Sequence, residues 1–261
     1  MNVRSDSGLK AAAAPWAAGD DVAPVGAAAD GYHNNARPEM LPFVPTAARR
    51  VLDVGCGAGA FSAALKRERP AVEVWGVEPD AAAHATASKV LDHALHGFFD
   101  QSLGLPEAHF DAIVFNDSLE HFPDHRLALQ LALRLLAPAG VLVASVPNVR
   151  YWPHLKHYLF EADWRYEDEG IRDHTHLRFF TQRSLVRSLQ ETAYEVVTAQ
   201  GINPCWQGRP LRQRLARWAL PSGMQDMLYL QFAVTARAAA VSAPSTSAAR
   251  QPAQLDGGQQ P

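Results

Sequence analysis

The sequence predicts an α/β protein built on one doubly wound, mixed sheet of seven strands, with the last strand antiparallel and helices on both faces. Short apolar strands alternate with helical segments, which is the pattern of parallel strands joined by crossover helices. A glycine-rich turn separates the first strand from the first helix. The final strand instead alternates apolar and polar residues, as antiparallel strands with unlike faces do.

The first half of the predicted sheet consists of strands that are each followed by a helix. The first strand is apolar except for Asp53, which is typical of a strand buried in a parallel sheet. The helix after it stops at Pro70, because proline lacks the N–H that would continue it. The strands are predicted at 51–54, at 72–77 and, weakly, up to 98–100, and the helices at 58–69 and from about residue 80.

The second half repeats the unit and then departs from it. Pro123 lies near the first turn of a helix, where proline is favoured. Pro138-Ala139-Gly140 predicts a turn into the next strand. The remaining strands are predicted at 110–115, 141–146, 194–199 and 228–235, and the helices at 123–136 and 181–192.

Length and composition fit a single core with appended segments. The chain has 261 residues, of which 48% are hydrophobic and 20% charged, and its formal net charge is −3. That charge gives no general attraction to nucleic acid, so we expect none as a partner. Two cysteines build no disulfide framework, and no apolar run reaches the roughly 20 residues that span a bilayer. We therefore expect a cytoplasmic protein without a transmembrane segment.

Changes in composition predict the domain boundaries. Residues 1–30 are rich in Ala, Gly, Pro and Asp without periodicity and predict a flexible tail, and 238–261 predict a disordered one. Between them, 31–237 form the predicted domain. It contains an aromatic-rich segment at 148–180, expected to cover the crevice as a substrate lid, and a basic helical insertion at 203–225.

A glycine-rich loop follows the first strand and opens the first helix. Its glycines allow a tight turn and a close ligand, and the helix N-terminus supplies free N–H groups. Glu78 ends the second strand, 78 − 55 = 23 residues after Gly55, where a carboxylate can accept the hydroxyls of a ribose. A dinucleotide or S-adenosylmethionine would fit. Asp53 favours the second, because a carboxylate repels a pyrophosphate and can orient the ammonium of an amino acid.

Residues 51–59 resemble the first motif of class I S-adenosylmethionine-dependent methyltransferases, and residues 74–78 resemble the second. The resemblance covers roughly 32–237 and implies a Rossmann-like fold. It also implies that Asp100 holds the adenine amino group; the alternative is a turn or cap residue. The full set of cofactor residues that it implies is Asp53, Gly55, Cys56, Gly57, Gly59, Glu78, Pro79, Asp100, Asn116 and Asp117.

A second polar group follows the fourth strand, at the edge where the carboxyl ends of parallel strands line a crevice. Asp117, Glu120 and His121 have i, i+3, i+4 spacing, which one helical turn would place on one side. Two carboxylates and an imidazole could bind a divalent metal such as Mg or Mn. The alternative is that Glu120 caps a turn while His121 lines the pocket.

This D-x-x-E-H spacing is similar to the E-x-x-E-H element of ubiquinone-pathway O-methyltransferases and small-RNA 2′-O-methyltransferases, which holds a metal. Asp117 stands where those families carry the longer glutamate. His176 matches a histidine of the same families, which implies a general base or a further metal ligand; the alternative is a structural histidine that fixes a loop. The candidate catalytic residues are His176, His121 and Glu120.

The segment 148–180 interleaves aromatic residues with arginines, which suits a sugar ring, an aromatic acceptor or a phosphorylated one; the alternative is a small hydrophobic cluster. Three pieces, Tyr32…Arg37-Pro38-Glu39, 146–152 and 173–185, resemble bacterial methyltransferases associated with glycosyltransferases and surface-polysaccharide assembly. This implies O-methylation of a small-molecule or glycan hydroxyl. The alternatives are a nicotinamide-dependent oxidoreductase and a non-catalytic module that binds S-adenosylmethionine and a protein partner.

Overall fold

The computed structural model of the chain describes residues 35–207 and 220–240. The predicted N-terminal tail, 1–30, lies outside the described residues. The predicted C-terminal tail, 238–261, lies outside them from residue 241 on, and the predicted helical insertion, 203–225, lies outside them at 208–219. No helix in the described ranges is long and apolar enough to cross a bilayer.

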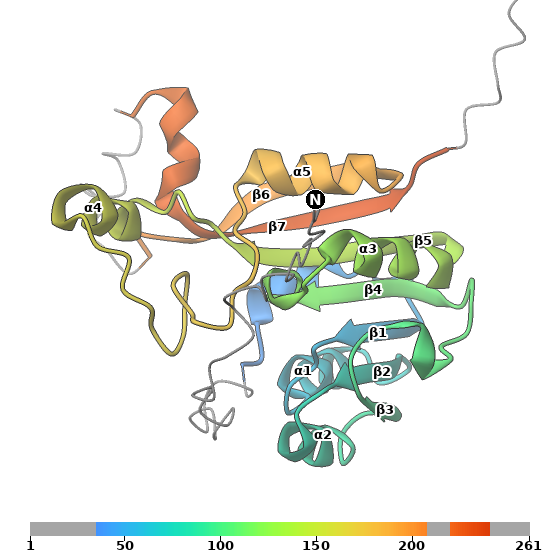
Figure 1. Cartoon of the computed structure of the whole chain (residues 1–261). Coiled ribbons are helices and arrows are strands. Elements are labelled where there is room, and N and C mark those ends of the chain that lie inside the picture. Colours follow the sequence, from blue (N-terminus) through green and yellow to red (C-terminus); the bar gives the residue numbers. More distant parts are fainter. Residues whose placement is uncertain (1–34, 208–219, 241–261) are drawn as a thin grey trace, which may run out of the picture.

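Seven strands form one sheet with helices on both faces (Figure 1). In chain order the strands are β1 (Arg50–Val54), β2 (Glu73–Glu78), β3 (His93–His96), β4 (Phe110–Asn116), β5 (Leu136–Pro147), β6 (Tyr194–Pro204) and β7 (Tyr229–Ala238). Their order across the sheet is β3-β2-β1-β4-β5-β7-β6. β1 pairs in parallel with β2 and β4, β2 with β3, and β4 with β5. β7 is antiparallel to both β5 and β6, so the predicted mixed sheet is confirmed.

Three of the described α-helices begin at a side chain that caps them. Asp80 and Asp124 accept backbone N–H groups at the starts of α2 and α3, and Thr181 forms a capping box with Ser184 at the start of α5. The α-helices are α1 (Ala60–Glu68), α2 (Ala81–Ala87), α3 (His125–Leu135), α4 (Trp152–Glu161) and α5 (Gln182–Glu191); the short 3₁₀ helices are η1 (Pro38–Phe43), η2 (Gln101–Leu103), η3 (Leu119–His121) and η5 (Ser222–Leu228).

Two apolar clusters cover the two faces of the sheet. On one face, Leu129 of α3 and Leu185 of α5 belong to the same cluster as Phe115. On the other, Met40 of η1 and Phe61 of α1 belong to the cluster of Val51 and Val143. The segment before β1 therefore packs on the sheet as part of the core, and its first described residues lie beside the carboxyl edge of the strands, where Arg37 pairs with Asp117.

Several element boundaries differ from the sequence prediction; β6, for example, ends at Pro204 and not near residue 199. The third strand ends at His96, not near residue 100. Phe98 is 75% exposed, while Phe99 turns back into the core, so the apolar pair that suggested a strand belongs to a loop. The turn predicted at 138–140 lies inside β5, whose pairing with β4 shifts register between Phe110 and Ala112. This irregularity accommodates Pro138, which has no N–H to donate to a neighbouring strand.

Candidate active site

The glycine loop between β1 and α1 has the conformation that the sequence predicts. Gly55, Gly57 and Gly59 have φ values of 74°, 54° and 83°, in the left-handed region that glycine adopts without steric cost. A Cβ at Gly55 would lie 2.9 Å from the Cβ of Ser118. The loop is therefore packed directly against the segment that follows β4.

Two buried carboxylates flank this loop. Glu78 is 4% exposed and accepts hydrogen bonds from the N–H groups of Gly57, at 2.8 Å, and Asp80, at 2.9 Å. Asp53 is 1% exposed and accepts a 2.7 Å hydrogen bond from the Ser62 hydroxyl. Burial raises the pKa of Asp53 to about 7, and the nearby charge of Glu78 acts in the same direction. A cation placed beside Asp53 would be stabilised by its ionised form.

Three further residues implied as cofactor contacts occupy different surroundings. The Cys56 sulfur is buried and would lie 2.7 Å from a Cβ at Gly76, so this side chain packs against β2. The carbonyl oxygen of Pro79 lies 3.0 Å from Nε2 of His96. Asp100 is exposed and caps η2, accepting a 2.8 Å hydrogen bond from the N–H of Ser102. The structure thus places Asp100 in the cap position that was its alternative interpretation.

Asp117 is not part of the helical turn that carries Glu120 and His121, so the three do not share the predicted single face. It precedes η3 and has a left-handed backbone with φ 49°. Its carboxylate pairs with Arg37 and accepts hydrogen bonds from Gln231 and, at 3.0 Å, from Ser145. The i, i+3, i+4 spacing fails here because the chain is not helical at Asp117.

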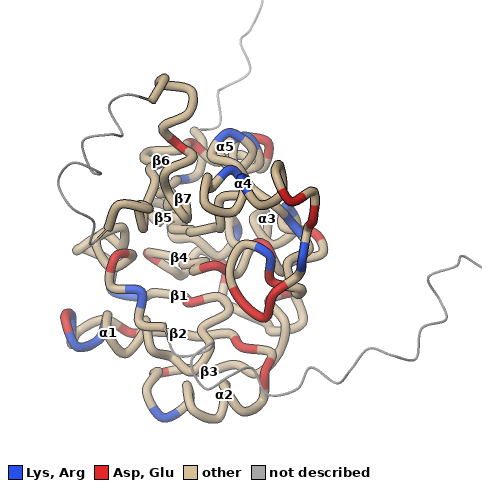
Figure 2. The backbone as a smooth tube through the Cα atoms, turned by 90° about the vertical axis from the view of Figure 1, so that its left-hand side faces the viewer, with Lys and Arg blue, Asp and Glu red and all other residues tan. Residues whose placement is uncertain are grey.

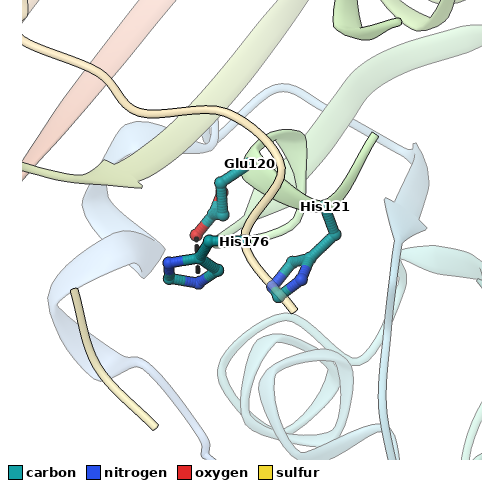
Figure 3. Close-up of side chains that lie close together, drawn as sticks. All are labelled: Glu120, His121 and His176. Atoms are coloured by element: carbon teal, nitrogen blue, oxygen red, sulfur yellow. Dashed lines mark ion pairs between the residues drawn. The ribbon is translucent and has the colours of Figure 1, made fainter. Parts of the chain in front are cut away.

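Glu120, His121 and His176 converge, as Figure 3 shows. One nitrogen or oxygen atom from each of the three lies within 4.8 Å of the others. Nε2 of His176 is 3.9 Å from Oε1 of Glu120, and the two imidazole centroids are 4.8 Å apart. Both carboxylate oxygens of Glu120 are buried and accept no hydrogen bond. The predicted catalytic residues therefore form one cluster.

Backbone contacts hold His176 against the end of β4. The carbonyl oxygen of Glu120 accepts hydrogen bonds from the N–H groups of Leu177 and Arg178, both at 2.9 Å. Nδ1 of His176 lies 3.3 Å from the carbonyl oxygen of Ile171. Nδ1 of His121 lies 3.3 Å from the carbonyl oxygen of Thr175. A proton on each Nδ1 satisfies these carbonyls and leaves each Nε2 lone pair available.

Burial sets the protonation of the cluster. Burial lowers the pKa of His176. The pKa of His121 is lowered by burial and, in addition, by the charge of the neighbouring His176. Burial and the charge of Asp117 raise the pKa of Glu120. Both imidazoles are consequently neutral near pH 7, which is the form that accepts a proton or binds a metal.

The end of β4 also carries polar groups that lack partners. Both amide atoms of Asn116 and the hydroxyl of Ser118 are buried without a hydrogen bond. Buried polar groups are normally paired, so these have capacity for a bound ligand. Sequence spacing does not identify Ser118 as a site residue. What points to Ser118 is its contact with the glycine loop, where a Cβ at Gly55 would clash with it, and this contact is visible only in the folded structure.

The segment predicted as a lid carries α4, none of whose residues is buried. Trp164 packs edge to face with Tyr158 and Phe179, at centroid distances of 5.9 and 5.7 Å. Part of the segment therefore forms a small hydrophobic cluster, which is the alternative to a substrate-binding lid. Acidic positions gather on the loop after α4, seen in Figure 2 in front of the sheet. They are Asp163, Glu167, Asp168 and Glu169, with Glu161 at the end of α4.

Comparison with known proteins agrees with this geometry. A family model described as a methyltransferase domain matches residues 29–199. Trans-aconitate 2-methyltransferase from an Escherichia coli strain is 27% identical over 198 residues, which are 73% of this chain and 73% of the relative. The enzyme of that name from Methylobacterium radiotolerans is 34% identical over 111 residues, which are 42% of this chain and 43% of the relative.

Solved structures show the same fold. A SAM-dependent methyltransferase from Archaeoglobus fulgidus has a TM-score of 0.57 at 19% identity, covering 76% of this chain and 89% of its own. An S-adenosylmethionine-dependent methyltransferase from Mesorhizobium loti has a TM-score of 0.54 at 20% identity, covering 78% and 98%. At these identities the likeness concerns the fold alone.

Proposed function

The chain belongs to the methyltransferase-domain family of S-adenosylmethionine-dependent enzymes, and from this premise we propose that it methylates a hydroxyl oxygen of a small molecule or glycan. The observation that carries the proposal is the convergence of Glu120, His121 and His176 (Figure 3) next to the segment that packs on the glycine loop. The family match speaks against the nicotinamide alternative. A buried acid–histidine cluster has no evident use in a module that only binds the cofactor.

The glycine loop and its two carboxylates are the proposed cofactor site. Bound S-adenosylmethionine would supply a methyl group already activated on a sulfonium. Asp53 would lose its proton beside the cationic ammonium, because a nearby positive charge lowers the pKa of a buried carboxyl. Glu78 has lone pairs left for ribose hydroxyls besides those that accept the N–H groups of Gly57 and Asp80.

His176 is the proposed general base. Its Nε2 lone pair is available when Nδ1 donates to Ile171, and its lowered pKa keeps the ring neutral. The Glu120 carboxylate, 3.9 Å from Nε2, would stabilise the imidazolium that forms when the acceptor hydroxyl gives up its proton. Placing that oxygen in line with the methyl group supplies the rest of the acceleration.

The same cluster fits a divalent metal such as Mg²⁺ or Mn²⁺, as a second candidate role. Both Glu120 oxygens lack hydrogen-bond partners, and each histidine has an oxygen beside Nδ1, as metal-bound histidines do. Glu120, His121 and His176 would hold the ion. Asp117 does not join them, because it is paired with Arg37. A cation held there would lower the pKa of an acceptor hydroxyl.

Charge near the site favours an uncharged acceptor over a carboxylate. The curated relatives are named for trans-aconitate, a tricarboxylate. In this chain the acidic residues of the loop after α4 outnumber its arginines, which are Arg165, Arg172 and Arg178. Arg150 is paired with Asp226 at 2.6 Å, and Arg172 is paired with Glu167. A polyanion would meet negative charge over this described part of the crevice. A sugar hydroxyl would not be repelled.

Calorimetry and acceptor assays test the proposal in two steps. We expect S-adenosylhomocysteine to bind the purified protein and to lose its affinity in Glu78→Ala, with the melting temperature retained. With labelled S-adenosylmethionine, we expect transfer to sugars or glycans and none to trans-aconitate. Transfer to trans-aconitate with every hydroxyl acceptor inert would contradict the hydroxyl assignment while leaving the cofactor site intact.

A further inference from the structure

A buried arginine joins the segment before β1 to the carboxyl edge of the sheet. Arg37 is 6% exposed. Its Nε donates to Glu39 at 2.7 Å, its Nη1 pairs with Asp117, and its Nη2 donates to Ser145 at 3.2 Å and Gln231 at 3.3 Å. These acceptors come from η1, from the end of β4, from β5 and from β7. One guanidinium therefore links four parts of the fold.

Asp117 is the acceptor in this network that lies next to the site. Arg37 and Gln231 both donate to Oδ2, while the Ser145 hydroxyl donates to Oδ1 at 3.0 Å. The backbone N–H of Asp117 also donates to the carbonyl oxygen of Ser145 at 3.1 Å. The side chain and the backbone of Asp117 are thus both fixed to β5.

The conformation of Asp117 is one that needs such support. Its φ of 49° is left-handed, and a residue with a Cβ adopts this region only at a steric cost. Unfavourable backbone conformations persist where the surrounding structure over-determines them, and they concentrate at functional sites. Without its fixed carboxylate, Asp117 would relax toward right-handed or extended backbone.

That relaxation would move the groups on either side. Asn116, with its unpartnered buried amide, comes immediately before Asp117. Ser118, which packs on Gly55 of the cofactor loop, comes immediately after it, and Glu120 of the acid–histidine cluster lies two residues further on. The direction of the chain at Asp117 therefore determines where all three side chains point.

We propose that Arg37 is a positioning residue: by holding Asp117 in the left-handed conformation, it orients residues 116–120 toward the cofactor loop and the acid–histidine cluster. It would act through Asp117, which its guanidinium contacts directly. The inference rests on the proposed function only for the role of Glu120. Its effect on the cofactor loop is measurable without any acceptor.

The test separates backbone direction from charge. We expect Arg37→Gln to bind S-adenosylhomocysteine about tenfold more weakly, as measured by calorimetry. Binding would then have to restore the left-handed backbone of Asp117, and the cost of that conformation corresponds to about this ratio. Adding Asp117→Gly should restore most of the affinity, because glycine holds a positive φ without support. Adding Asp117→Ala removes the same carboxylate but keeps a Cβ, and should not restore it.

Two outcomes would overturn the proposal. One is an affinity of Arg37→Gln equal to that of the unmodified protein. The other is equal rescue by glycine and alanine, which would mean that Arg37 serves only to neutralise a charge. Arg237→Gln, which breaks an exposed pair with Glu195, is the matched control for loss of an arginine. If Arg37→Gln does not fold, Asp117→Gly and Asp117→Ala in the unmodified chain give the same comparison: glycine must bind more tightly than alanine.

Discussion

Nε2 of His176 lies 3.9 Å from Oε1 of Glu120, and both side chains are less than a tenth exposed. A buried carboxylate that accepts no hydrogen bond is costly to hold ionised, which raises the pKa of Glu120 and keeps the neighbouring imidazole neutral. Neutral His176 has a free lone pair for the acceptor proton, and the imidazolium so formed would stabilise an ionised Glu120.

Replacement of His176 should therefore affect turnover and not cofactor binding. We expect His176→Ala to lower kcat by about 10²–10⁴-fold, the range of general-base catalysis, with the affinity for S-adenosylhomocysteine unchanged. His174, two residues earlier and 61% exposed at its side chain, provides the matched control, and His174→Ala should retain activity. Comparable losses in both variants would assign His176 a structural role in its loop.

The metal role makes a separate prediction. If Glu120, His121 and His176 hold a cation, EDTA should abolish methyl transfer and Mg²⁺ or Mn²⁺ should restore it. Calorimetry with Mn²⁺ alone should show one site that is lost in His121→Ala. Activity that is indifferent to chelation, with no Mn²⁺ binding, would refute the metal and leave His176 as a base.

Cofactor affinity should depend on pH through Asp53. Its pKa in the folded protein, about 7, lies above the ordinary value of 3.8, so its contribution to stability is present at low pH and lost as the pH rises through 7. A bound cation reverses this preference, because it favours the ionised form. Calorimetry should therefore show tighter binding of S-adenosylhomocysteine at pH 8 than at pH 6, and Asp53→Asn should flatten the difference. An unchanged slope in Asp53→Asn would contradict this role.

The glycine loop offers a test of packing against backbone strain. Gly55 and Gly170 both have a positive φ, 74° and 86°, but only Gly55 has a neighbour where a Cβ would go. We expect Gly170→Ala to lower the free energy of unfolding by about 1 kcal/mol, from strain alone. Gly55→Ala should cost about 1–3 kcal/mol more, because Ser118 must shift. Urea denaturation measures both, and equal losses would mean that the loop is not packed against Ser118.

Several features of the fold and the site are carried by local sequence and can be predicted from it. The strand–loop–helix pattern around Gly55, the acid at Glu78 and the alternation of the last strand each follow from residues close together in the chain. The alternation of the last strand predicts an antiparallel strand, and the pairing of β7 confirms it. His176 was associated with the end of β4 through a family resemblance and not through any spacing rule.

Features that depend on backbone direction or distant contacts were missed. Helical spacing groups Asp117 with Glu120, but Asp117 has a left-handed φ that no glycine in the sequence marks. Arg37 received no role, since nothing in the sequence links it to a carboxylate at the end of β4. Phe98 and Phe99 suggested a strand because two adjacent aromatic residues do not reveal which of them turns into the core.

The chemical bond formed on the acceptor distinguishes methylation of a hydroxyl from methylation of a carboxylate. A cell extract incubated with the protein and methyl-labelled S-adenosylmethionine yields a labelled product whose stability in mild alkali can be measured. Methylation of a hydroxyl gives an ether, which alkali leaves intact, so we expect alkali-stable label that is absent with His176→Ala. Label released as methanol would show a carboxylate ester and contradict the hydroxyl assignment.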